Sequence, residues 1–98
     1  MPDFRDVDPR ELRLPSSRGT GADPYKLQRQ LARFGASTAG MPPILVREGT
    51  DGVLLILDGI TRATRVAKLQ PGAKVRVEVV LQASRPFAGL PKVGDTLP

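Results

Sequence analysis

The chain has 98 residues and a net charge of +5 at pH 7, and it contains no cysteine and no histidine. This length predicts one domain with one hydrophobic core. The missing residue types exclude disulfides, thiolate metal sites, cysteine nucleophiles and histidine bases, so any catalysis would depend on carboxylates, hydroxyls, Lys, Arg or a loosely held Mg²⁺.

The basic excess favours anionic partners, namely nucleotides, nucleic acid or an acidic protein surface. A basic surface that serves only solubility explains the charge equally well. The longest apolar run, residues 53–57, is too short to span a bilayer, and the first residues contain no apolar signal-peptide core. We therefore expect a cytoplasmic protein that does not contact a membrane.

The first 22 residues predict a short strand or extended lead-in followed by a polar loop. Residues 4–14 carry scattered apolar side chains, and Pro9 allows a turn within them. The loop, residues 15–22, holds a single charge, Arg18.

The first helix is predicted from its start signal at Asp23-Pro24 to about Phe34. Aspartate is a good N-cap and proline suits the first helical position. Leu27 and Leu31 fall with Phe34 on one apolar face, and the following glycine is a natural stop.

A loop at 36–42 leads to a short strand at 44–46, a turn at 49–52 and a second strand at 53–57. This second strand is apolar on both faces, which is typical of a central strand. Gly59 ends it.

The second helix is predicted at 60–69, and the strictly alternating run 74–80 predicts a strand that buries its valines on one face. Residues 84–98 are rich in Pro and Gly, so we expect an extended arm or tail outside the compact core. The predicted organisation is a small α+β domain over residues 1–83, with a mixed sheet and two main helices, and a tail at 84–98. The predicted core consists of Leu27, Leu31, Phe34, Ile44, Val46, Leu55, Leu57, Val66, Val75, Val77 and Val79.

The junction between the apolar strand and the second helix is the candidate site. Unpaired N–H groups at a helix start carry partial positive charge, and Gly59 lets a ligand approach the backbone. Thr61 and Arg62 add a hydroxyl and a guanidinium, a set that suits a phosphate. On a helical wheel Arg62 lies close to the apolar side, so either an anion or an acidic partner, Asp58 or Asp51, holds it there.

Six runs in this order resemble the ParB/sulfiredoxin-like N-terminal domain: VDPREL at 7–12, PSSR at 15–18, FG at 34–35, PILVR at 43–47, LDGITRATRVA at 57–67 and VRVEV at 75–79. The resemblance covers about residues 4–81. It implies that Gly59, Thr61 and Arg62 line a nucleotide-phosphate pocket, and that Arg18 closes over the same phosphates.

The chain also departs from that family. The ParB branch has an acidic residue where Ile60 stands, which counts against ParB-type nucleotide hydrolysis. Sulfiredoxin needs a cysteine there, so cysteine-sulfinate reduction is excluded. No helix-turn-helix segment follows, so we do not expect the chain to read a DNA site as a full ParB does.

Three functions remain open. The first is a module that binds a nucleotide or another phosphate ligand, in a sensing or regulatory role, with a nucleoside triphosphate and Mg²⁺ as the implied cofactor. The second is a Mg²⁺-dependent nuclease, NTPase or phosphotransferase in which Asp58 holds the metal or acts as base, unless Asp58 only caps the helix. The third is an accessory that binds nucleic acid or protein through the basic helix faces, with Lys26, Arg29, Arg33, Arg65 and Lys68. Arg65 and Lys68 are otherwise interpreted as solvated charges, and no metal site built from protein ligands is predicted.

Overall fold

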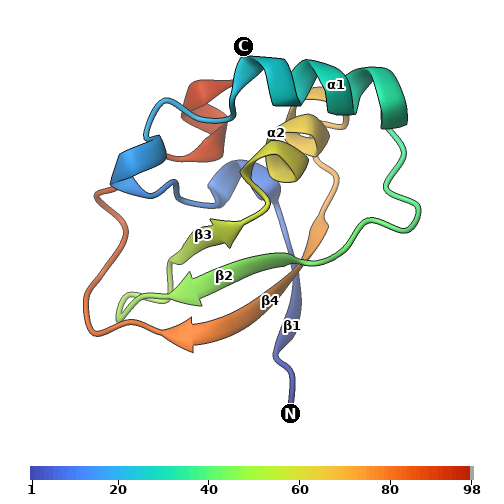
Figure 1. Ribbon diagram of the computed structural model, residues 1–98. Helices are drawn as coiled ribbons and strands as arrows, with labels where there is room; N and C mark the ends of the chain where they lie inside the picture. Colours follow the sequence, from blue (N-terminus) through green and yellow to red (C-terminus); the bar gives the residue numbers. More distant parts are fainter. Residues whose placement is uncertain (98) are drawn as a thin grey trace.

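A computed structural model of the protein describes residues 1–97, and Figure 1 shows two helices lying over one side of a four-stranded sheet. The α+β class predicted from the sequence is confirmed. The elements are β1 (Phe4–Val7), α1 (Pro24–Phe34), β2 (Ile44–Glu48), β3 (Leu54–Asp58), α2 (Ile60–Leu69) and β4 (Val75–Gln82), with 3₁₀ turns at Pro9–Glu11, Ser16–Arg18 and Val93–Thr96. Within residues 1–97, no helix has the length and apolar character needed to cross a membrane.

The sheet has the order β1-β4-β2-β3 and is mixed. β1 pairs with β4 and β2 with β3 in antiparallel fashion, whereas β2 and β4 are parallel. The predicted turn at 49–52 joins β2 to β3, and the Gly49 N–H donates to the Val53 carbonyl at 2.9 Å. α2 connects β3 to β4, which places its first turn directly after the end of β3.

The prediction that the apolar strand is central is wrong, because β3 lies at the edge of the sheet. The backbone of Arg13 takes the place of a further strand there. Its N–H donates to the Leu54 carbonyl at 2.9 Å, and its carbonyl accepts from the Ile56 N–H at 3.0 Å. An edge strand covered in this way can bury apolar residues on both faces, as a central strand does.

The start of α1 follows its sequence signals. The Asp23 carboxylate accepts the N–H groups of Tyr25 and Lys26 at 2.8 and 3.2 Å. Pro24 stands at the first helical position, and Gly35, with φ of +55°, ends the helix. The end of α1 at Gly35 marks where the loop at 36–42 begins. Residues of that loop line the site.

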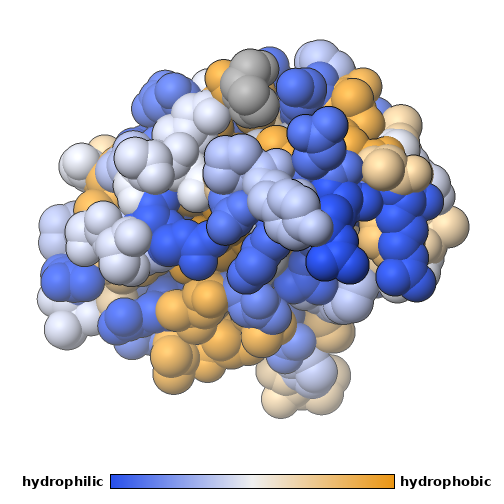
Figure 2. Space-filling view, turned by 45° about the horizontal axis from the view of Figure 1, so that its top comes forward, coloured by the Kyte–Doolittle hydropathy of each residue, from blue (hydrophilic) through white to orange (hydrophobic). Residues whose placement is uncertain are grey.

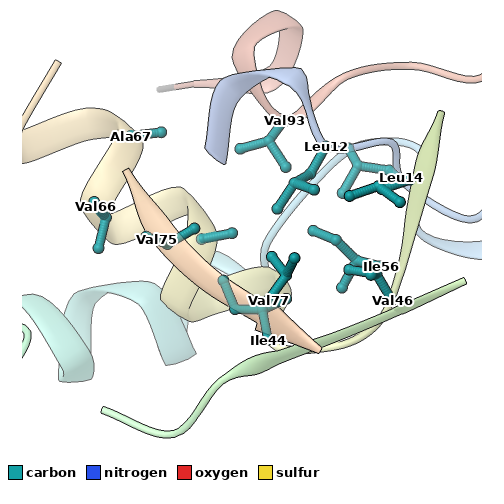
Figure 3. Packing of buried hydrophobic residues seen from close by; sticks show 12 residues of the cluster. Leu12, Leu14, Ile44, Val46, Ile56, Val66, Ala67, Val75, Val77 and Val93 are labelled. Carbon is teal, nitrogen blue, oxygen red and sulfur yellow. The ribbon is translucent and has the colours of Figure 1, made fainter. Parts of the chain in front are cut away.

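The core lies between the sheet and α2, with contributions from residues 12–14 and the C-terminal segment (Figure 3). Its buried members are Leu12, Leu14, Ile44, Val46, Leu54, Ile56, Ala63, Val66, Ala67, Val75, Val77 and Val93. Of the predicted core, Leu27, Ile44, Val46, Leu55, Val66, Val75 and Val77 are buried, while Leu31 and Val79 are half-buried. The predicted register of β4 is confirmed over residues 74–77, since Lys74 and Arg76 are exposed and Val75 and Val77 are buried, whereas Glu78, predicted to be exposed, is half-buried like Val79.

Two predicted core residues are exposed instead: Phe34 at 43% and Leu57 at 44%. Leu57 is the extra residue at an irregularity in the β2–β3 pairing, where Leu45 pairs with Asp58 but Val46 pairs with Ile56. A bulge of this kind re-aims the side chain of the extra residue. Phe34 lies at the last position of α1, beyond the part of the helix that reaches the core.

The expectation that residues 84–98 lie outside the compact core is wrong for the described residues 84–97, while Pro98 lies outside the described part. Phe87 and Val93 are 1% and 0% exposed. The Asp51 carboxylate accepts the N–H of Phe87 at 3.1 Å, and the Val93 N–H donates to the Leu12 carbonyl at 2.9 Å. Turn-forming residues therefore guide this segment along a defined path back over the domain (Figure 1).

Replacing Phe87 by Ala is expected to lower the free energy of unfolding by about 3–5 kcal/mol, the range for a buried Phe→Ala change. Urea denaturation followed by circular dichroism measures this change. The matched control is Leu81→Ala, because Leu81 is 54% exposed and its truncation removes little buried surface. Equal effects of the two substitutions would show that Phe87 is not a core residue.

Asp51 is expected to make stability sensitive to acid. Desolvation raises the pKa of its carboxyl group, but the N–H groups of Val53, Ala88 and Phe87 together outweigh it, so the pKa is lowered from 3.8. A lowered carboxyl pKa stabilises the fold above the unfolded-state pKa, and this contribution disappears as pH falls through the folded-state pKa. Melting temperatures from pH 6 down to about pH 2 should therefore fall less steeply for Asp51→Asn than for the unmodified chain. Parallel curves would contradict this assignment.

Candidate functional site

A cleft of about 550 Å³ opens at the N-terminus of α2, between α1, the loop at 37–42 and the end of β3. All of the residues that the sequence singled out for a phosphate or for catalysis line it: Arg18, Asp58, Gly59, Thr61 and Arg62. The structure therefore brings the loop arginine together with the strand–glycine–helix junction, as the sequence predicted. Figure 2 shows a broad band of hydrophilic residues across the side of the molecule on which the helices lie, with apolar residues below it.

Gly59 shapes the floor of the cleft. It precedes α2 with φ of +113°, a conformation that other residues rarely adopt. A Cβ at this position would lie 2.9 Å from the Arg62 guanidinium and 3.1 Å from the Ile44 side chain. The glycine thus makes room for Arg62, and no side chain caps the helix, which leaves the N–H groups of the first turn free to bind a ligand.

Arg62 is paired with Asp58, one of the two acidic partners considered from the sequence. The distance between Arg62 Nη2 and Asp58 Oδ2 is 3.4 Å, and the two side chains are 17% and 73% exposed. Asp51 is not a partner, because its carboxylate binds the backbone at Phe87 and Ala88. A pair in which one partner is largely exposed contributes at most about 1 kcal/mol, so Asp58 holds Arg62 only weakly.

Arg65 is not a solvated charge, contrary to the prediction, because it is 2% exposed. Its Nη1 donates to the carbonyls of Gly35 and Ser37 at 2.9 and 2.7 Å, and its guanidinium lies 5.3 Å from the centre of the Phe34 ring. The end of α1 and the loop after it cover this side of α2, which a helical wheel drawn for α2 alone does not reveal. Burial lowers the pKa of Arg65 from its ordinary value.

The cleft is strongly cationic. Four basic side chains line it, and in the described part of the chain Asp58 is its one carboxylate. The basic residues are Arg18, Lys26, Arg62 and Arg65. The Arg65 Nε atom is buried and has no hydrogen-bond acceptor among residues 1–97. Because charges in a partly enclosed cleft are screened less than those on an open surface, this arrangement favours an anionic ligand.

The residues of the predicted basic surface are only partly cleft residues. Lys26 and Arg65 belong to the cleft, whereas Arg29 lies over the Tyr25 ring at 5.8 Å and Arg33 over the Phe34 ring at 5.2 Å. Arg29, Arg33 and Lys68 do not line the cleft.

Sequence reasoning missed Lys26 and Arg65 as cleft residues, and it missed the apolar wall made by Phe34, Met41 and Ile60. One available signal was spacing, because Arg65 follows Arg62 by three residues and such positions are neighbours on a helix surface. Lys26 could not be found in this way, since only the packing of α1 beside α2 brings it near.

Gly59→Ala is expected to lower the free energy of unfolding by roughly 1–3 kcal/mol for the positive φ, and further because the new methyl group meets Arg62 and Ile44. Gly72→Ala is the matched control, since Gly72 also has a positive φ, +89°, but nothing lies near its missing Cβ. The difference between the unfolding free energies of the two variants, measured by urea denaturation, gives the cost of the contact with Arg62 and Ile44. If Gly59→Ala costs no more than Gly72→Ala, Arg62 does not lie against Gly59.

Neither the comparison with models of protein families nor the comparison with curated proteins gave a match for this chain.

Proposed function

We propose that the cleft at the N-terminus of α2 binds a phosphate-bearing ligand, and that the domain is a sensing or regulatory module that uses this ligand. The observation that carries the proposal is a cleft that four cationic side chains line and that includes a helix start with no side-chain cap. Helix N-termini and arginine side chains both bind phosphate oxygens well.

The phosphate would bind at the first turn of α2. The backbone N–H groups of this turn and the Thr61 hydroxyl supply neutral donors, while Arg62 and Arg18 supply charged ones. Phosphate oxygens compete with the Asp58 carboxylate for Arg62, and the long Arg62–Asp58 contact of 3.4 Å makes that exchange inexpensive in free energy.

The other end of the cleft suits the organic part of such a ligand. Phe34 and Met41 provide apolar surface there, and Gln30 adds a side-chain amide that can donate or accept hydrogen bonds. A cleft of about 550 Å³ is in the size range of sites for small molecules and nucleotides. A nucleoside phosphate, with Mg²⁺ on its phosphates, is therefore the ligand class that we favour.

The proposal includes the finer fold assignment, a ParB/sulfiredoxin-like domain. Its support is the order of the elements: α1, the β2–β3 hairpin and α2, which follows Gly59, come before the last strand, β4. In the ParB/sulfiredoxin-like domain the strand–Gly–x–x–Arg–helix element holds phosphates, and Gly59 and Arg62 occupy those positions.

An enzyme is the alternative, and it depends on Asp58. Its carboxylate lines the cleft and is exposed enough to hold Mg²⁺ or to accept a proton. A single carboxylate that already pairs with Arg62 supports binding better than catalysis. Turnover of a nucleotide that requires Mg²⁺ and disappears in Asp58→Asn would favour the enzyme.

Arg62→Ala is expected to weaken binding of a nucleoside triphosphate by roughly 10- to 100-fold, the loss of about 1.5–3 kcal/mol that a charge-assisted hydrogen bond supplies. A panel of nucleotides is first screened by the rise in melting temperature, and the best ligand is then titrated by calorimetry. Arg76→Ala is the matched control, because Arg76 is an exposed arginine that pairs with Asp6 at 3.6 Å away from the cleft.

If a nucleotide binds with equal affinity to the Arg62→Ala and unmodified chains, its pocket lies elsewhere. If no phosphate compound raises the melting temperature, the Arg62–Asp58 pair has only a structural role and the proposal fails. Retention on DNA that falls steeply with salt, without nucleotide binding, would instead favour the nucleic-acid accessory.

A further inference from the structure

A second cleft, of about 480 Å³, borders the first at Leu57, which lines both. It lies between β3 and the loop that brings the C-terminal segment back over the domain. Its accessible apolar surface comes from Leu57, Pro86 and Leu90, and the buried side chains of Leu55 and Phe87 lie behind it. Its charged residues are two arginines, Arg47 from β2 and Arg85 from the loop.

The two arginines lack acidic partners. No carboxylate lines this cleft, and the ion pairs within residues 1–97 belong to other cations: Arg5, Arg10, Arg62, Arg76 and Lys92. The Arg47 Nε atom is buried without a hydrogen-bond acceptor. Burying a polar donor without an acceptor costs free energy, so Arg47 keeps unused hydrogen-bonding capacity beside the cleft.

The Phe87 ring holds both guanidinium groups in place. Arg47 and Arg85 lie over it, with their guanidinium carbons 5.8 and 5.7 Å from the ring centre. A guanidinium that rests on an aromatic ring keeps its N–H groups available at its edge for an anion. Phe87 itself is 1% exposed, so its ring offers no face on which a nucleotide base could stack.

The loop that carries Arg85 and Phe87 is rigidly attached. Asp51 accepts the N–H groups of Phe87 and Ala88 at 3.1 and 2.9 Å. From the other side, Arg13 Nη1 donates to the carbonyls of Ala88 and Leu90 at 2.8 and 2.7 Å. A site held in this way loses little conformational entropy when a ligand binds.

We propose that this second cleft binds the carboxylate of a small organic acid whose apolar part rests on Leu57 and Leu90. A carboxylate has two oxygens, which two guanidinium groups can satisfy. The one other polar side chain that lines the cleft is Ser16, at the start of the 3₁₀ turn Ser16–Arg18, and the rest of the lining is mainly apolar, which suits a carboxylate attached to an apolar group. The proposal is independent of the phosphate ligand proposed for the first cleft.

The test uses hexanoate as probe and the full chain labelled with ¹⁵N. Hexanoate should shift, with saturation, the amide signals of Arg47, Phe87 and Leu90. Hexanol and acetate should bind at least about tenfold more weakly, because each lacks one of the two features that the cleft recognises. Arg85→Ala should weaken hexanoate binding by a similar factor, and this variant should fold because Arg85 is exposed.

Arg76→Ala is again the matched control, since Arg76 also lies over a phenylalanine ring, that of Phe4 at 5.9 Å, but pairs with Asp6. It should leave hexanoate binding unchanged. The proposal is overturned if hexanoate shows no saturable shifts at these residues, if hexanol binds as tightly as hexanoate, or if Arg85→Ala and Arg47→Ala both leave the affinity unchanged. Inorganic phosphate that shifts the same signals at equal affinity would overturn the selectivity for a carboxylate.

Discussion

The guanidinium group of Arg65 lies between α2 and the loop that follows α1, where its Nη1 donates to the carbonyls of Gly35 and Ser37. These two hydrogen bonds attach the end of α1 to the middle of α2. They therefore determine the position of the loop at 37–42, which walls the first cleft. Carbonyl oxygens satisfy the donors of a guanidinium, but they do not cancel its charge. The charge that stabilises the contact between the helices consequently also makes the cleft attractive to anions.

The end of β3 has a comparable double role. Its irregular pairing with β2 turns Leu57 outward, and the strand ends one residue before Gly59, whose positive φ starts α2. Leu57 then separates two clefts of different chemistry. The first has an uncapped helix start and four basic side chains, whereas the second has two arginines over a buried phenylalanine and an apolar surface. Both clefts carry positive charge, but the lining of the first includes the start of α2 and several polar side chains, whereas the lining of the second is mainly apolar.

The C-terminal segment packs against residues 12–14 near the start of the chain and also lines the second cleft. Phe87 and Val93 are buried, and backbone hydrogen bonds tie residues 91 and 93 to Leu14 and Leu12. The same residues 12–14 cover the outer edge of β3 through Arg13. A small domain has little apolar area to bury, so this segment, which also walls the second cleft, adds buried apolar side chains that the domain needs for stability.

Local chemistry was enough to predict the elements and the centre of the first cleft. The Asp23-Pro24 start, the Gly35 stop, the alternating valines of β4 and the glycine before α2 each act over a few residues, and each appears as expected. The position of β3 at an edge, the burial of Arg65 and the packing of Phe87 were not predictable in this way. Each depends on a segment distant in sequence: the Arg13 backbone, the loop after α1, and Asp51. Periodicity reports which side of an element is apolar, but only tertiary packing decides which distant segment covers it and whether a charge on that side remains in water.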